Sequence, residues 1–221
     1  MSKTVLCIVG KSGSGKTSLA LHLRNYIPIV SSRTTRPARD GEINGEPPYH
    51  KFLSTDDYIK DVVTNGKVAI GDLSRGDDII LADTQFGEYT YWALASDVFK
   101  HAQSVVGYII DPIGVAALNK AIHLAGELII RYGFKRQQAP LLWTVAKAKV
   151  KVLYVDAVEK VMELTPKSRR DRDESQKLGW ELCDTLASFR FTTPYIEDER
   201  ERKVLMGLQA KKLSDVIHEQ L

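Results

Sequence analysis

The sequence predicts an α/β fold, a parallel sheet flanked by helices, and three observations support this prediction. Residues 4–9, 105–110 and 150–155 are short apolar runs, the pattern of strands buried on both faces. Each run is followed by a helical pattern, and such alternation is typical of a parallel sheet. The chain has 221 residues, of which 43% are apolar, and this suffices for one domain with one hydrophobic core.

The first strand leads through a glycine-rich loop into a helix. The strand at residues 4–9 stops at Gly10, and Leu19, Ala20 and Leu23 then recur at the spacing of one buried helical face. The chain therefore begins with a strand, a glycine loop and a helix.

A stretch of different composition separates this helix from the strand at residues 105–110. It is rich in Gly, Pro, Asp and Tyr and contains short alternating runs such as residues 79–85. We therefore expect a single domain, residues 1–221, in which a small, partly β subdomain (residues 31–95) is inserted in a core of residues 1–30 and 96–221.

Two further helices are expected near the C-terminus, at residues 173–189 and 199–221. The apolar residues of the last one fall on roughly one face, and we expect this face to pack on the core: Val204, Leu208, Leu213, Ile217 and Leu221. The sequence contains no internal repeat and no low-complexity tract.

The glycine-rich loop matches the phosphate-binding motif GxxxxGK[ST] at residues 10–17, between a predicted strand and a predicted helix. Glycines allow successive backbone N–H groups to point at phosphate oxygens, and the helix N-terminus adds positive potential. Lys16 is expected to reach the β- and γ-phosphates of ATP, and Thr17 to bind Mg²⁺. The predicted ATP-binding residues are Gly10, Ser12, Gly13, Ser14, Gly15, Lys16, Thr17 and Ser18.

Three arginines, Arg33, Arg36 and Arg39, follow in a segment with little apolar content. Guanidinium groups bind phosphate with two parallel hydrogen bonds, so this segment suits a second anion site. A solvated basic loop is the alternative.

Residues 31–45 read Ser-Ser-x-Thr-Thr-Arg-x-x-Arg-x-Gly-Glu-x-x-Gly and are followed by Tyr49, Phe52 and Ser54. This pattern resembles the monophosphate-binding region of guanylate kinases. The resemblance extends to about residue 57, resumes at residues 83–115 and is loose from residue 150. It implies that the acceptor phosphate is held by Arg36, Arg39, Tyr49 and Tyr91, and that Ser32 lies near the base.

Asp111 follows the strand at residues 105–110 and matches the family's aspartate near Mg²⁺ and the acceptor nucleotide. The carboxyl end of a parallel strand also suits such a role on physical grounds. The alternative is that Asp111 only caps the following helix.

Residues 165–174, which carry Arg169, Arg170 and Arg172, resemble the arginine-bearing lid of the family. Phosphoryl transfer needs positioning and charge neutralisation, and a lid of this kind also excludes water. The resemblance thus implies that catalysis uses one or more of these arginines, together with Lys16 and Asp111. A solvated connection between helices is the alternative.

The departures from the family concentrate on the base pocket. The family's guanine-binding glutamate has its best counterpart in Asp83, with Asp72 the weaker candidate. The family's Tyr-Gly-Ser/Thr triplet appears as Tyr91-Trp92-Ala93, so a hydroxyl is lost and an indole is gained. We expect Trp92 to stack on the base and the choice of base to be altered or broader.

Two other stretches depart from the family. Residues 118–149 are longer than the resemblance leads one to expect and mix basic with aromatic residues; packing on the domain is favoured over nucleic-acid binding. Thr192-Thr193-Pro194 stands where the family has an asparagine near adenine.

The sequence therefore predicts an ATP- and Mg²⁺-dependent nucleoside monophosphate kinase, with GMP or dGMP as the first candidate acceptor. One alternative is a sugar-phosphate kinase of the same fold, acting on a ribose bisphosphate. Another is a non-catalytic guanylate-kinase-like interaction domain, which the presence of Lys16, Thr17 and Asp111 argues against.

The bulk composition adds expectations about location and partners. A net charge of +3 does not indicate a nucleic-acid partner, and the N-terminal apolar run is too short for a membrane span. Cys7 and Cys183 stand apart in apolar stretches, as buried thiols of a reduced protein do. We expect a cytoplasmic monomer or homodimer.

Overall fold

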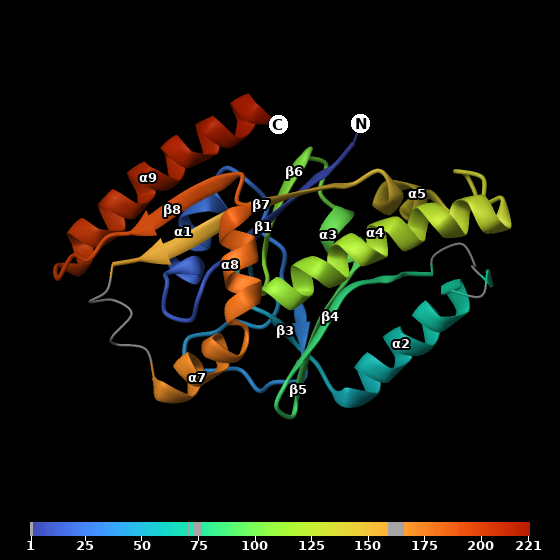
Figure 1. Cartoon of the computed structure of the whole chain (residues 1–221), viewed down its shortest axis with the longest axis horizontal. Coiled ribbons are helices and arrows are strands. Elements are labelled where there is room, and N and C mark those ends of the chain that lie inside the picture. Colours follow the sequence, from blue (N-terminus) through green and yellow to red (C-terminus); the bar gives the residue numbers. More distant parts are fainter. Residues whose placement is uncertain (1, 70, 73–76, 159–165) are drawn as a thin grey trace.

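A parallel sheet forms the core of the molecule in the computed structural model, which describes residues 2–69, 71–72, 77–158 and 166–221. The strand order is β6-β1-β7-β8, and each neighbouring pair is parallel (Figure 1). The strand bounds are β1 Thr4–Val9, β6 Val105–Ile109, β7 Lys149–Ala157 and β8 Phe189–Thr193. The predicted α/β class with a helix-flanked parallel sheet is confirmed.

Helices cover both faces of this sheet. Successive side chains of a strand point to opposite faces, so a strand of consecutive apolar residues makes both faces apolar. Val5 and Cys7 of β1 belong to one buried cluster, whereas Leu6 and Ile8 belong to another. The first cluster includes residues of α3 (Ala95–Phe99), α4 (Pro112–Tyr132), α5 (Pro140–Ala146) and α8 (Lys177–Thr185). The second includes residues of α1 (Lys16–Leu23) and α9 (Glu199–Gln220).

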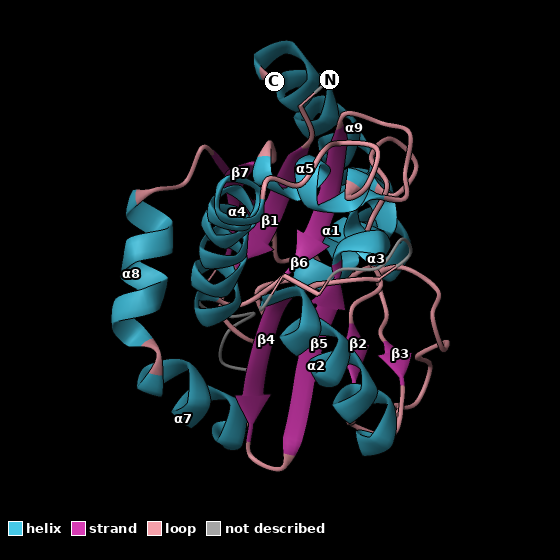
Figure 2. Cartoon of the chain, turned by 90° about the vertical axis from the view of Figure 1, so that its right-hand side faces the viewer, coloured by secondary structure: helices cyan, strands magenta, loops and turns pink. Residues whose placement is uncertain are grey.

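A second sheet lies within the segment for which a partly β subdomain was predicted. Its order is β3-β2-β5-β4; β4 and β5 form an antiparallel hairpin, β2 pairs antiparallel with β5, and β3 pairs parallel with β2. The bounds are β2 Arg33–Thr34, β3 Lys51–Phe52, β4 Ile80–Phe86 and β5 Tyr89–Leu94, with helix α2 at Thr55–Ala69. The carboxyl ends of the core strands point toward this sheet (Figure 2).

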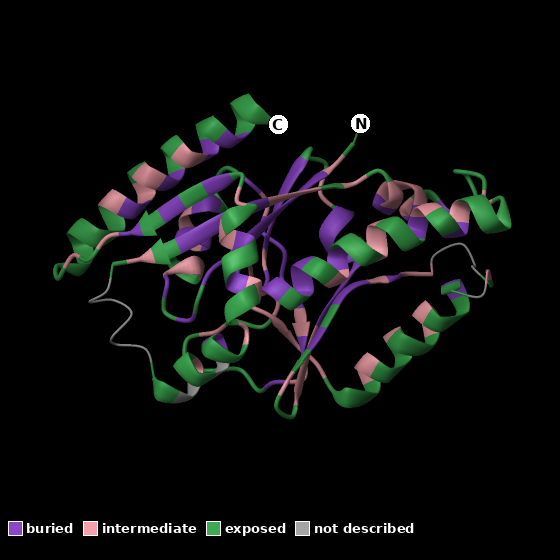
Figure 3. Cartoon of the chain, in the orientation of Figure 1, coloured by how far each residue is buried: buried purple, intermediate pink, exposed green. Residues whose placement is uncertain are grey.

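Two sequence-based details of the C-terminal region are corrected. The helix expected at residues 173–189 is divided into α7 (Lys167–Ser175) and α8, and β8 begins at Phe189. In α9 the buried residues include Met206, Ala210 and Ile217, whereas Val204 and Leu208 are 65% and 58% exposed (Figure 3). The apolar residues of α9 are spread too widely around the helix for sequence spacing alone to show which edge turns inward.

The stretch at residues 118–149 packs against the core. Leu118 and Leu128 of α4 and Leu142 of α5 are buried, and the indole N–H of Trp143 donates to the carbonyl of Phe134 at 2.9 Å. Within the described residues α4 is also long and apolar enough to cross a membrane, judged by length and composition alone.

Candidate active site

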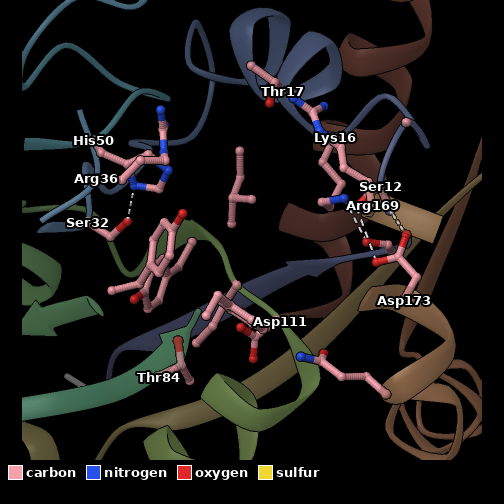
Figure 4. A pocket seen from close by; sticks show the side chains of 18 of the residues that line it. Ser12, Lys16, Thr17, Ser32, Arg36, His50, Thr84, Asp111, Arg169 and Asp173 are labelled. Atoms are coloured by element: carbon pink, nitrogen blue, oxygen red, sulfur yellow. Dashed lines mark hydrogen bonds between the residues drawn. The ribbon is translucent and has the colours of Figure 1, made fainter. Parts of the chain in front are cut away.

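A cleft of about 250 Å³ opens where the carboxyl ends of β1 and β6 meet the second sheet (Figure 4). Its wall contains the glycine loop, the arginine segment, the β4–β5 hairpin, the start of α4 and one side of α7 and α8. It brings together most of the predicted site residues: Gly10, Ser12, Gly13, Lys16, Thr17, Ser32, Arg36, Arg39, Tyr91, Asp111 and Arg169. Ligands of open parallel sheets bind at this edge.

The glycine loop is shaped as an anion cradle. Gly15 has φ +89° and is the N-cap of α1, and no side chain caps this helix end, so its N–H groups can serve a ligand. A Cβ at Gly15 would lie 2.5 Å from Oγ1 of Thr193, and that same hydroxyl donates to the carbonyl of Ser14 at 2.7 Å. Glycine is therefore required here by both conformation and space.

Lys16 lies at the mouth of the loop and is held by it. Its ammonium donates to the carbonyls of Gly10 and Lys11 at 2.6 and 2.8 Å. Ser12 donates through its backbone N–H and its hydroxyl to the carboxylate of Asp173, at 2.8 and 3.1 Å. Asp173, which the sequence did not single out, thus reaches the phosphate-binding loop from α7.

The arginine segment forms the opposite end of the cleft and is not a solvated loop throughout. Arg36 is 6% exposed, lies 2.9 Å from the carboxylate of Glu42 and sits over the ring of Phe52. Partial burial, together with the charges of Arg36 and Arg169, lowers the pKa of Arg39. Positive charge gathered at a partly dehydrated site is suited to bind a phosphate.

His50 completes this end of the cleft and was missed by the sequence reasoning. Its Nδ1 lies 2.7 Å from the hydroxyl oxygen of Ser32, and its ring meets that of Tyr91 edge to face. Burial, followed by the charge of Arg36, lowers the pKa of His50 to about 4. The ring is therefore neutral at pH 7.

Tyr49 does not line the main cleft, whereas the next residue, His50, does. Tyr49 lines a smaller neighbouring pocket of about 100 Å³, which shares Ser32, Arg39 and His50 with the cleft. Tyr49 stands at a turn, where its backbone N–H donates to the carbonyl of Glu46 at 2.8 Å, and its neighbour His50 lines both the smaller pocket and the cleft.

The β4–β5 hairpin presents Thr84, Phe86 and Tyr91 to the cleft, but not Asp83. Asp83 is exposed on the other side and accepts a hydrogen bond of 2.6 Å from the hydroxyl of Tyr58. Thr84 pairs with Tyr91 across the hairpin, and Asp83 pairs with Trp92, so the two pairs occupy opposite faces. The structure therefore places Asp83 outside the cleft, whereas the neighbouring Thr84 lines it.

Trp92 is likewise turned away from the cleft. It is fully buried, and its indole N–H donates to Asp61 at 2.8 Å. The expected stacking of this indole on a base is therefore not available. Asp72, the weaker candidate for reading the base, is exposed and does not line the cleft, and Ala93 is fully buried.

Asp111 caps the following helix and also lines the cleft. Its Oδ1 accepts a hydrogen bond of 2.7 Å from the backbone N–H of Gly114, as the N-cap of α4. The residue also lines the cleft between the glycine loop and the hairpin. Capping holds the carboxylate in a fixed orientation at the cleft.

Arg169 and Asp173 of α7, Trp180 of α8, and Gln176 between the two helices line the remaining side. Oε1 of Gln176 and Nε1 of Trp180 are buried and have no hydrogen-bond partner in the part of the chain that the structure describes. Arg170 is exposed and does not line the cleft, and the side chain of Arg172 lies outside the described residues. Of the two lid arginines whose side chains the structure describes, Arg169 lines the cleft and Arg170 does not.

A second cavity, of about 390 Å³, adjoins the other side of the glycine loop. Gly13, Gly15 and Ser18 lie on one wall, and Thr193 and Pro194 lie on the other, next to α9. The predicted ATP-binding residue Ser18 therefore faces this cavity rather than the cleft.

The phosphate-binding loop at the carboxyl edge of a parallel sheet, with a second sheet facing it, defines a P-loop kinase-like fold. The solved structures agree. The guanylate kinase of Anaplasma phagocytophilum superposes with a TM-score of 0.55 at 14% sequence identity, covering 100% of this chain and 87% of that chain. This likeness establishes a guanylate-kinase-like fold.

Other comparisons add nothing to this. A sugar kinase from Janibacter sp. HTCC2649 has a TM-score of only 0.32 at 13% identity, over 97% of this chain and 95% of that chain, which is too low to bear on the fold. No family model matches the sequence, and no curated protein matches it either.

Proposed function

We propose that the protein transfers the terminal phosphoryl group of ATP to a nucleoside or deoxynucleoside monophosphate. The observation that carries the proposal is that one cleft carries basic side chains at two ends. The glycine loop with Lys16 forms one end, and Arg36 and Arg39, beside His50, form the other. Asp111 and Arg169 line the same cleft, where a transferring group would have to be positioned and neutralised.

Each end has a distinct task in this reaction. The loop amides and Lys16 bind the phosphates of ATP, and the base of ATP enters the 390 Å³ cavity beside Thr193. Arg36 and Arg39 hold the acceptor phosphate. Arg169 closes over the group in transfer, and the lid excludes water that would otherwise accept it.

The residues present fit Mg²⁺ that arrives with ATP. Within the described residues no group of three or more His, Cys, Asp or Glu side chains could hold a metal ion alone. Thr17 and Asp111 line the same cleft, and their oxygens are of the kind that binds Mg²⁺ together with phosphates. When bound, the ion supplies neutralisation of the charge on the phosphoryl oxygens.

The acceptor base is expected to be read by neutral groups. Ser32, His50, Thr84 and Tyr91 line that part of the cleft, and Asp83 does not. GMP and dGMP remain the first acceptors to test, but neutral hydrogen-bonding groups discriminate between bases less strongly than a carboxylate does, so other bases should also be used.

One observation favours a nucleotide over a ribose bisphosphate. The rings of Phe86 and Tyr91 both line the cleft, with their centroids 5.7 Å apart. Aromatic rings suit a flat base, and Phe86 offers no hydrogen-bond donor to a second phosphate. The intact loop around Lys16 likewise favours an enzyme over a binding module. Such an enzyme would act in the cytoplasm as a monomer or homodimer, without a nucleic-acid or membrane partner.

A coupled ADP-release assay tests the proposal directly. The acceptors are all common ribo- and deoxynucleoside monophosphates, with ribose 1,5-bisphosphate included, and Lys16→Ala serves as the control. Turnover with at least one monophosphate, absent in the variant, is expected. Turnover with ribose 1,5-bisphosphate alone would mean that the acceptor is a sugar phosphate and not a nucleoside monophosphate. No turnover with any of the acceptors would refute the kinase assignment.

A further inference from the structure

The contact between α7 and the glycine loop joins two segments that are 161 residues apart in sequence. Asp173 is 6% exposed, although carboxylates are rarely buried without partners. Both of its oxygens are bound by the same residue: Oδ2 accepts from the backbone N–H of Ser12, and Oδ1 accepts from the Ser12 hydroxyl. This is a two-point clamp made of charge-assisted hydrogen bonds.

The clamp acts on the helix that carries Arg169. Residues four apart lie on one face of a helix, so Arg169 and Asp173 face the same way, and both line the cleft. Figure 4 shows Asp173 bound to the loop and Arg169 close to it. Fixing one turn of α7 on the loop therefore fixes the turn before it over the cleft.

The docking of α7 depends on the hydrogen bonds between Asp173 and Ser12. Without the two donors of Ser12, Asp173 would be a buried carboxylate lacking two of its hydrogen bonds, and α7 would be driven to expose it to water. Asp171 and Glu174 on the same helix are already exposed and gain nothing from docking. The docked position of α7 thus depends on the Asp173 carboxylate and on Ser12.

We infer that Asp173 is a positioning residue, which latches α7 onto the phosphate-binding loop and so sets Arg169 over the group in transfer. The catalytic part of this inference rests on the proposed kinase function. The latch itself does not, because it is a property of the free protein.

Amide hydrogen exchange of the full chain tests the latch without any turnover. Asp173→Ala and Ser12→Ala are compared with Asp171→Ala, which removes the same charge from an exposed site of the same helix. We expect exchange in residues 167–175 to be at least about tenfold faster in Asp173→Ala, faster to a smaller extent in Ser12→Ala, which keeps the backbone N–H donor, and unchanged in Asp171→Ala. Equal exchange in all three variants and the wild type would overturn the latch. Asp173→Asn, which keeps a side chain of the same size and shape, should give an exchange rate between those of the wild type and Asp173→Ala. If Asp173→Ala does not fold, Asp173→Asn is used in its place.

Kinetics then test the link to Arg169. Asp173→Ala should lower kcat roughly 100-fold, the scale of loss expected from a catalytic group displaced by about 1 Å, and Asp171→Ala should leave it within about twofold. In an Arg169→Ala background, Asp173→Ala should cause almost no further loss, because its effect passes through Arg169. If the double variant instead shows the product of the two single-variant losses in kcat, Asp173 does not act through Arg169. A wild type without kinase activity would refute the proposed function, whereas the exchange data would still decide the latch.

Discussion

The Nδ1 of His50 lies 2.7 Å from the hydroxyl oxygen of Ser32, at the end of the cleft where Arg36 and Arg39 also lie. Burial of the ring and the nearby positive charges of Arg36 and Arg39 disfavour a proton on it. Burial is the largest cause, and the pKa of His50 falls to about 4.

This lowered pKa predicts a pH-dependent contribution to stability. In the unfolded chain His50 titrates near its ordinary value of 6.5, so between pH 6.5 and 4 the unfolded state binds the proton and the folded state does not. The contribution of His50 is thus fully present above pH 6.5 and is lost as the pH falls toward 4. From pH 7 to 4, the unfolding free energy of the wild type should fall by roughly 1–3 kcal/mol more than that of His50→Gln. Denaturant titrations at pH 7, 5.5 and 4 measure this, and parallel curves for the two proteins would contradict it.

Removing the Lys16 ammonium should abolish turnover while the fold is retained. Lys16 faces the cleft from the phosphate-binding loop, where it would neutralise charge that develops on the transferring group. We expect Lys16→Ala to lower kcat/KM by about 1000-fold or more, with an unchanged thermal midpoint. Near-normal rates in a folded variant would exclude the assigned role of the loop.

Arg39→Ala should weaken binding of the monophosphate and spare the binding of ATP. A hydrogen bond to a charged partner contributes about 1.5–3 kcal/mol, and Arg39 lines the cleft close enough to Arg36 for the two charges to interact. Calorimetric titration with each nucleotide separates the two sites. Arg131→Ala, which removes the same charge from an exposed position on α4, is the matched control and should change neither affinity. A fall in ATP affinity in Arg39→Ala would mean that the two ends of the cleft are assigned in reverse.

The hairpin geometry predicts that Thr84, not Asp83, influences the choice of base. Asp83→Ala should cost about 1 kcal/mol of stability through the lost bond to Tyr58, and it should leave the ratios of kcat/KM among bases within about twofold. Thr84→Val keeps the shape but removes the hydroxyl, and should shift those ratios by about three- to tenfold. The assay compares dGMP, dAMP and dTMP. A shift in Asp83→Ala alone would place the carboxylate back in the pocket.

Local sequence was sufficient where the functional residues are contiguous. The glycine loop, Arg36 and Arg39 each lie within one short segment, and all of them line the cleft. The face of a strand is a finer property, because a shift of one residue in register exchanges its two sides. This accounts for Asp83, where the neighbouring Thr84 faces the cleft instead.

Contacts between distant segments were beyond the reach of the sequence pattern. Nothing near residue 12 indicates that its partner is Asp173, since the fold alone brings the two together. The lid prediction therefore named three arginines without separating them, and it overlooked the carboxylate that docks their helix.

The contact of Thr193 with Gly15 and Ser14 also bears on when, during synthesis of the chain, the glycine loop can take its final shape. The phosphate-binding motif is translated within the first 17 residues, but the side chain against which its loop is moulded comes near the end of the chain. Domains generally fold as units once synthesis has supplied their parts. A truncated chain ending before β8 would thus carry the complete motif and yet lack the wall that shapes it, so the loop takes this shape only after β8 has been synthesised.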